Sequence, residues 1–196
     1  MTILAPVILS AASFEVAPLK SGLFDFKTCG IGSLNASMAR GSLEKSLCGR
    51  DVIFVGTCGS FYSFTEVHLV RGGEVFWYPP CERAGLSWSI ENLHPPLALR
   101  ASPLLADLPM RTVVTSPTIS KEKDLPPLGD NSLSAKIAVE NLELYPVVSY
   151  LLPVVRSLQV VLAVTNEICS EGRQQWRAHH KKAAEITALY LNSKLR

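Results

Sequence analysis

Residues 51–60 read Asp51-Val52-Ile53-Phe54-Val55-Gly56-Thr57-Cys58-Gly59-Ser60. The first part, Asp51 to Gly56, is apolar without alternation, which is typical of a strand buried on both faces of a parallel or mixed sheet. The second part, Gly56 to Ser60, predicts a glycine-lined turn at the carboxyl end of this strand. Open α/β sheets bind their ligands at such strand ends. The stretch therefore predicts an α/β fold with a site where this strand ends.

Other apolar runs extend the predicted sheet. The runs with the same buried character are Val7 to Ala11, Arg111 to Thr115 and Gln159 to Thr165, and Ile137 to Glu143 is a further strand candidate,. Between the first two strands, Gly32 to Leu47 carries apolar residues at helical spacing after a glycine-containing turn,. This segment predicts a crossover helix.

One hairpin and two more helices complete the expected elements. Val67 to Tyr78 predicts two short strands around Gly72-Gly73,. Tyr145 to Leu158 predicts a buried helix that a proline would kink, and Gly172 to Leu195 predicts a long terminal helix with one apolar side. Together these elements predict a single three-layer α/β domain over residues 1–196, with a central mixed sheet flanked by helices,.

Composition excludes several classes of protein. The 196 residues are 47% hydrophobic and 18% charged, which is too apolar for a disordered chain, and a net charge of +2 is too small for a nucleic-acid partner,. Prolines and polar residues interrupt the most apolar region, Leu144 to Val164, so we expect no membrane span. Five cysteines without a CxxC pair disfavour a disulfide framework and fit a cytoplasmic location,. The proline-rich middle, Pro79 to Gly129, predicts loops.

Three polar residues stand where apolar runs end. Glu15 and Glu143, if brought to the same sheet edge, could bind sugar hydroxyls and act as a general base. Ordinary solvated glutamates at strand ends are the alternative. Asn166 ends the strand near Gln159 to Thr165, and it either caps the next helix or faces a ligand.

Other candidate groups leave alternatives open. The turn Cys29-Gly30-Ile31-Gly32 opens a helix, so its N–H groups face an anion or ligand hydroxyl, or the turn simply packs tightly on the sheet. Cys58 is a possible nucleophile, but no histidine lies in a partner motif, which favours a buried structural thiol. The basic run from Arg173 to Lys182 predicts a solvated helix face. The adjacent His179 and His180 point in different directions, which argues against metal chelation.

Five short motifs occur in an order that resembles the purine and uridine phosphorylase superfamily. Within that superfamily, they resemble the nucleosidases for methylthioadenosine, S-adenosylhomocysteine and futalosine. Futalosine hydrolase is the most similar of these. The motifs are Ala11-Ala12-Ser13-Phe14-Glu15, Cys29-Gly30-Ile31-Gly32-Ser33-Leu34-Asn35-Ala36, Val55-Gly56-Thr57-Cys58-Gly59, Val139-Glu140-Asn141-Leu142-Glu143 and Ala163-Val164-Thr165-Asn166. A helix that carries a tryptophan follows the last motif.

The resemblance implies cleavage of the N-glycosidic bond of a purine nucleoside. It implies that Glu143 holds the ribose hydroxyls, that Glu15 positions or deprotonates the attacking water, and that Asn166 binds the leaving base. Members that handle adenine carry aspartate at the last position. An asparagine amide can donate to a six-oxo group and accept from a protonated N7, which predicts hypoxanthine or guanine as the base of a futalosine- or inosine-like substrate. The further substrate contacts that the resemblance implies are Gly30, Thr57, Cys58, Gly59 and Leu142.

Two departures from the family pattern define alternative functions. Phosphorylases of the hexameric type carry an arginine three positions before Thr57, where this chain has Phe54, so we expect water as nucleophile. A phosphorylase that holds phosphate on Gly30 to Ser33 and Thr57 is the alternative. Nucleosidases carry an arginine four positions before Asn166, where this chain has Leu162, and a catalytically silent nucleoside-binding protein is therefore a third hypothesis. The resemblance implies no metal, no organic cofactor, and a homodimer or larger homo-oligomer.

Overall fold

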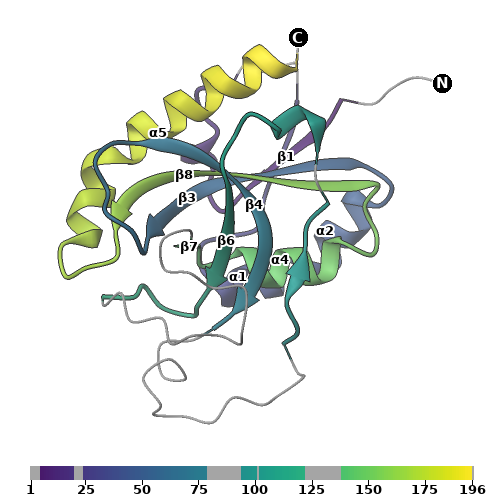
Figure 1. The fold of residues 1–196 in the computed structure, drawn as a ribbon. Helices are drawn as coiled ribbons and strands as arrows, with labels where there is room; N and C mark the ends of the chain where they lie inside the picture. Colours follow the sequence, from purple (N-terminus) through teal and green to yellow (C-terminus); the bar gives the residue numbers. More distant parts are fainter. Residues whose placement is uncertain (1–4, 20–23, 79–93, 101, 122–137, 196) are drawn as a thin grey trace.

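A mixed sheet lies at the centre of the molecule (Figure 1). The computed structural model describes residues 5–19, 24–78, 94–100, 102–121 and 138–195. The strands are β1 (Val7–Ser10), β2 (Asp25–Thr28), β3 (Asp51–Ser60), β4 (His68–Trp77), β5 (Leu97–Ala98), β6 (Met110–Thr115), β7 (Ala138–Glu140) and β8 (Ser157–Glu167). No sequence pattern predicts β2, because its residues are mostly polar and exposed at the sheet edge.

The strand pairings close part of the sheet into a ring. β1, β3 and β8 run parallel to one another, with Ile8 opposite Ile53 and Val55 opposite Val161. β8 pairs with β4 antiparallel, β4 with β6 parallel, β6 with β7 parallel, and β7 with β3 antiparallel. The ring leaves β1, β2 and β5 outside it and brings the ends of β3, β7 and β8 together.

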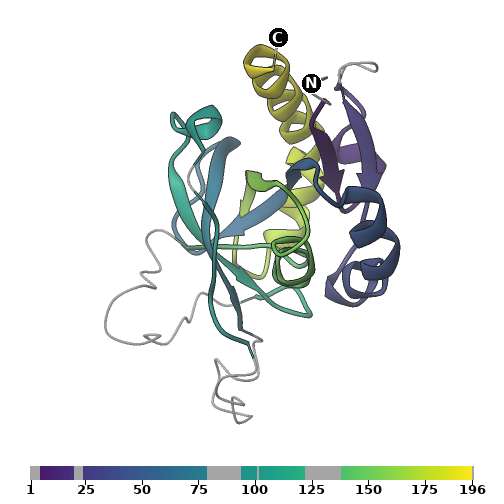
Figure 2. The same cartoon turned by 90° about the vertical axis from the view of Figure 1, so that its right-hand side faces the viewer.

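Helices cover both faces of the sheet, as predicted (Figures 1 and 2). They are α1 (Ser33–Met38), α2 (Arg40–Leu47), α4 (Leu144–Leu151) and α5 (Gly172–Lys194), with the short 3₁₀ helices η1 (Ser13–Glu15) and η2 (Pro103–Leu105). Leu9 and Phe54 pack into the core beneath α1, α2 and α4. Their neighbours Ile8 and Ile53 pack into the core beneath α5. Because successive strand residues face opposite sides, the unbroken apolar runs match a sheet buried on both faces.

The predicted hairpin around Gly72-Gly73 is wrong, because β4 runs as one strand through both glycines. A Cβ added to Gly72 would lie 3.0 Å from side-chain atoms of Leu99 and Val160. A Cβ added to Gly73 would lie 2.8 Å from Met110. The two glycines therefore permit the close approach of neighbouring segments, which is the other common reason for glycine inside a strand.

The glycine-lined turn predicted over Gly56 to Ser60 is also wrong, because a continuous strand occupies these residues. β3 continues to Ser60 and pairs with β8 almost to its end. The register of this pairing shifts between Cys58 and Gly59. The local irregularity falls where the turn was expected.

The predicted helices differ in extent. The helix expected over Tyr145 to Leu158 is α4, which ends at Leu151, and the residues from Ser157 onward already belong to β8. Pro153 lies just beyond the helix end, because proline cannot continue a helix.

The helix expected over Gly32 to Leu47 is broken at Ala39 into α1 and α2. The apolar residues of the second half, such as Leu47, are buried. Those of the first half, Leu34 and Met38, are 74% and 75% exposed. The helical spacing thus predicted the type of element, but not which side chains enter the core.

Some sequence features lie outside the residues that the structure describes: Pro79-Pro80, Cys81 and Pro126-Pro127. In the part that is described, we find no helix long and apolar enough to cross a membrane.

Candidate functional site

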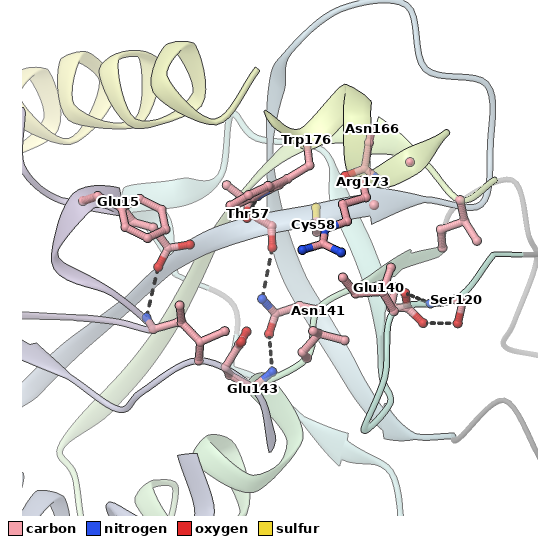
Figure 3. A pocket seen from close by; sticks show the side chains of 18 residues that line it. Glu15, Thr57, Cys58, Ser120, Glu140, Asn141, Glu143, Asn166, Arg173 and Trp176 are labelled. Atoms are coloured by element: carbon pink, nitrogen blue, oxygen red, sulfur yellow. Dashed lines mark hydrogen bonds between the residues drawn. The ribbon is translucent and has the colours of Figure 1, made fainter. Parts of the chain in front are cut away.

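A cavity of about 280 Å³ opens where β3, β7 and β8 end, and residues from the start of α5 line it (Figure 3). Small-molecule sites in proteins have volumes from roughly 300 Å³ upward. The cavity is lined by all but one of the predicted site residues: Glu15, Thr57, Cys58, Gly59, Leu142, Glu143 and Asn166. The exception is Gly30. The five motifs therefore converge on one cavity, although they are spread over the chain.

Glu15 is a buried carboxylate held by backbone N–H groups. It lies in η1, and its Oε2 accepts from the N–H groups of Ala11 and Ala12 at 3.1 and 3.2 Å. Burial, together with repulsion from Glu143, raises the pKa of Glu15 from 4.5 to about 7, against the lowering effect of these hydrogen bonds. A carboxyl group with a pKa near neutrality is suited to general-base catalysis.

Glu143 is positioned from two sides. The N–H of Gly32 donates to its Oε1 at 2.7 Å, and its own backbone N–H donates to Asn141 Oδ1 at 3.1 Å. Asn141 is in turn fixed to β3, since its Nδ2 donates to the carbonyl of Thr57 at 3.1 Å. Burial raises the pKa of Glu143. The Gly32 N–H fixes one carboxylate oxygen of Glu143. The second oxygen and the remaining lone pairs are left for a ligand in the cavity.

The Gly30–Gly32 turn binds a carboxylate of the protein itself. The anion that its N–H group faces is Glu143. Both glycines have a positive φ, +86° for Gly30 and +84° for Gly32, which other residues rarely adopt,. A Cβ added to Gly30 would also lie 2.8 Å from Cβ of Asn35. Tight packing and anion binding, given above as alternatives, thus occur together in this turn.

Asn166 lies near the end of β8 and lines the cavity. Its Nδ2 donates to the carbonyl of Glu167 at 3.1 Å, and its Oδ1 accepts from the hydroxyl of Thr165 at 3.0 Å. One N–H and one acceptor lone pair of the amide are left for a ligand. Asn166 does not cap α5, which begins at Gly172.

Two glycines make room for the Asn166 amide. A Cβ added to Gly59 on β3 would lie 2.8 Å from Asn166 Nδ2. A Cβ added to Gly172 would lie 3.2 Å from the same atom and 2.8 Å from the carbonyl oxygen of Glu167. Gly172 thereby lets the start of α5 approach the cavity.

Cys58 lines the cavity as a buried thiol. Burial raises its pKa well above the ordinary value. A cysteine nucleophile reacts as the thiolate, so the protonated, buried group matches the structural interpretation. The nearby Cys29 is also buried, and its pKa is raised to about 12 by burial and by repulsion from Glu143 and Glu15.

Aromatic side chains form one rim of the cavity. Trp176 on α5 donates its Nε1–H to the hydroxyl of Thr57 at 3.1 Å. His180 stacks on Trp176 with ring centroids 5.0 Å apart, and Phe14 contacts Trp176 edge-on at 6.3 Å. The sequence predicts Trp176 only on the apolar side of the terminal helix, because nothing in its spacing indicates a partner on β3.

Two ionisable side chains in the cavity wall were not predicted as site residues. Glu140 is buried and accepts from the hydroxyl of Ser116 at 2.8 Å and from the backbone N–H and hydroxyl of Ser120. Arg173 is exposed, as the predicted solvated face requires, but it also lines the cavity. Its position three residues before Trp176, on the same side of a helix, is the signal that could have found it.

The positions where the family that the sequence resembles carries arginine are apolar and buried in this protein. Phe54 and Leu162 are both 0% exposed and belong to the core beneath α1, α2 and α4. Neither supplies a charge to the cavity. Within the described ranges, no group of three or more His, Cys, Asp or Glu side chains is arranged to hold a metal ion.

No protein-family model matches the sequence, and no curated protein matches it. Solved structures match over nearly the whole chain. A mutant futalosine hydrolase of Helicobacter pylori is 14% identical with a TM-score of 0.71, covering 98% of this chain and 99% of its own. The methylthioadenosine/S-adenosylhomocysteine nucleosidase of Helicobacter pylori is 13% identical with a TM-score of 0.72, covering 100% and 99%. A Chlamydia trachomatis nucleosidase of that type is 12% identical with a TM-score of 0.71, covering 98% of both chains. The chain therefore has the mixed α/β fold of these nucleosidases.

Proposed function

We propose that this protein hydrolyses the N-glycosidic bond of a purine nucleoside, with a 6-oxopurine as the leaving base. The observation that carries the proposal is that Glu15, Glu143 and Asn166, far apart in the sequence, line one cavity. Carboxylates placed in this way suit a ribosyl group, and an amide suits a purine edge. The fold shared with futalosine hydrolase and methylthioadenosine nucleosidase structures supports the same class of reaction.

The carboxylates define the sugar end of the cavity. Glu143, with Oε1 fixed by Gly32, would accept hydrogen bonds from ribose hydroxyls through its remaining lone pairs,. Glu15 would take a proton from water as the water oxygen bonds to C1′ and the bond from C1′ to the base nitrogen breaks. The electron pair of that bond leaves with the base. A pKa of about 7 leaves a useful fraction of Glu15 ionised at neutral pH.

The base end is defined by Asn166. Its unused N–H would donate to the oxygen at position six, and its unused lone pair would accept from a protonated N7,. The proton on N7 comes from solvent, so the base leaves as a neutral purine, and the two hydrogen bonds of Asn166 stabilise that form and lower the barrier to bond cleavage. An adenine presents an amino group where the amide N–H points, so the 6-oxo base is the better partner.

We favour water over phosphate as the nucleophile. The position of the phosphorylase arginine is Phe54, which is buried in the core. The N–H of Gly32, one of the donors a phosphate would use, already binds Glu143. The cavity therefore lacks the arginine and one of the free N–H donors that a phosphate-dependent phosphorylase would use to hold phosphate.

We also propose that residues 1–196 form one domain that acts as a cytoplasmic homodimer. Ile31, Leu34 and Met38 are 58%, 74% and 75% exposed, and Ile31 also lines the cavity. Leu34 and Met38 share one face of α1 because they are four residues apart. A second copy would cover these apolar side chains beside the cavity mouth. Light scattering after size exclusion tests this, and a monomer at working concentration contradicts it.

A cleavage assay tests the proposed reaction. Inosine, futalosine and methylthioadenosine are incubated with the protein with and without phosphate, and the free base is measured by chromatography. We expect release of hypoxanthine independent of phosphate, and loss of release in the matched variant Glu143→Gln. Strict dependence on phosphate would establish a phosphorylase, and binding without release of any base would establish a silent nucleoside-binding protein.

A further inference from the structure

One cation points into the cavity from α5. Arg173 lines the cavity, and within the described residues its guanidinium has no hydrogen bond or ion pair with another side chain (Figure 3). The carboxylates Glu15 and Glu143 lie farther toward the other end of the view. An arginine carries five N–H donors and no acceptor. Its unused donors are therefore available to a ligand.

The start of α5 is held where Arg173 reaches the base end of the cavity. Gly172 brings the helix against Asn166 and Glu167, since a Cβ there would lie 3.2 Å from Asn166 Nδ2 and 2.8 Å from the Glu167 oxygen. Arg173 is the next residue. The amide of Asn166 and the guanidinium of Arg173 therefore approach the same end of the cavity from β8 and from α5 (Figure 3).

The position of Arg173 is unfavourable for the helix itself. The N-terminus of a helix carries a partial positive charge, which disfavours a cation in the first turn. The residue that caps this end of α5, Glu171, is acidic and offsets part of that cost. The argument for Arg173 therefore rests on its place in the cavity wall beside Asn166.

We propose that Arg173 is a catalytic and specificity-determining residue that donates hydrogen bonds to the six-position oxygen of the leaving base. The proposal rests on the proposed function and deepens it. That oxygen has two lone pairs, and Asn166 has only one N–H left to offer,. Arg173 supplies the second donor. As the glycosidic electron pair moves onto the base, the guanidinium stabilises the negative charge that gathers there.

The same geometry discriminates against adenine. A six-amino group is a hydrogen-bond donor. It would face the N–H donors of Arg173, and no hydrogen bond could form between the two groups. A site built to hydrogen-bond one group discriminates by a large factor against an analogue that cannot complete the hydrogen bond. Arg173 thus selects an oxo base over an amino base.

Kinetics of Arg173→Gln test the proposal, with Arg177→Gln as the matched control. Arg177 is exposed on the next turn of α5 and does not line the cavity. The substrates are inosine, adenosine and p-nitrophenyl riboside, whose leaving group has no purine edge. For Arg173→Gln we expect kcat/KM to fall about 10²-fold on inosine but less than about threefold on p-nitrophenyl riboside. The preference for inosine over adenosine should fall as well.

Other results would overturn the proposal. Equal loss on inosine and p-nitrophenyl riboside would mean that Arg173 acts on the fold or on the sugar. No loss on inosine would make it a solvated surface residue. Arg177→Gln should match wild type on all substrates, and the unfolding temperature of Arg173→Gln should not fall.

Calorimetry with free hypoxanthine and adenine separates this proposal from the proposed function. If the wild type cleaves no nucleoside but prefers hypoxanthine, and Arg173→Gln loses that preference, the base-binding role stands while the reaction is wrong. If the wild type cleaves inosine and Arg173→Gln is unchanged, the reaction stands and the role of Arg173 is wrong. A wild type that neither cleaves inosine nor binds hypoxanthine overturns both.

Discussion

Replacing Glu15 by glutamine is expected to stabilise the protein at high pH and to remove its activity. Glu15 is buried with a raised pKa, so its ionised form disfavours the folded state. Glutamine has nearly the same shape, and its oxygen can still accept from the N–H groups of Ala11 and Ala12. The exchange therefore removes the charge while keeping these two contacts.

The magnitude follows from the pKa of Glu15 in the two states. The ordinary value is 4.5 and the folded value is about 7. One pKa unit corresponds to roughly 1.4 kcal/mol, so ionised Glu15 costs about 3 kcal/mol of folding free energy once the pH exceeds 7,. Below 4.5 the carboxyl is protonated in both states, and the penalty vanishes. Between these values the unfolded chain binds fewer protons, and stability falls as pH rises.

Urea unfolding of wild type and Glu15→Gln across this pH range measures the effect. The advantage of the variant should grow by about 3 kcal/mol from the acidic to the alkaline side. Glu143 is present in both proteins, so its own titration largely cancels. Glu185→Gln, at an exposed position on α5, is the control and should change little. A difference between Glu15→Gln and wild type that is constant with pH would refute the reasoning.

The remaining predictions concern the groups around Glu15. Glu143→Gln is expected to lower kcat about 10²- to 10³-fold without a loss of stability in urea unfolding, because its amide oxygen can still accept from Gly32 and the exchange removes a buried charge; a loss of stability would make the residue structural. Gly59→Ala is expected to destabilise by about 1–3 kcal/mol and to weaken hypoxanthine binding in calorimetry, since its Cβ would lie 2.8 Å from Asn166 Nδ2. The kcat/KM for inosine should rise with pH and level off above about 7, as Glu15 ionises,; a flat profile contradicts a general base.

The candidate site residues that the sequence indicates line one cavity because they follow buried strands. Apolar runs without alternation correctly predicted β1, β3, β6 and β8, since both faces of the sheet are covered. Polar residues that end such runs must emerge at the strand ends. Asn166 and Glu143 do so on β8 and just after β7, and the cavity forms between them.

Glycine patterns were less informative, because glycine has two structural uses. Gly72-Gly73 and Gly56 to Ser60 were predicted as turns, yet both lie inside strands. In each case a neighbouring segment approaches too closely for a Cβ: Met110 at Gly73 and Asn166 at Gly59. Such contacts join residues that are distant in sequence, so the local spacing of residues does not predict them. Arg173 was missed as a cavity residue for a different reason, because the basic run was assigned to the solvated face of the helix although its spacing places Arg173 on the same side as Trp176,.

The charges of the cavity favour water over a phosphate dianion. Glu15 already has a pKa of about 7, and repulsion from Glu143 contributes to that value. A phosphate placed beside these carboxylates would add negative charge at short range and raise the pKa of Glu15 further. Phosphate needs no base in order to attack, but it would have to approach the carboxylates against this repulsion. Water adds no charge, and in the proposed hydrolysis Glu15 stays available as its base. The carboxylate pair thus disfavours phosphate as the nucleophile.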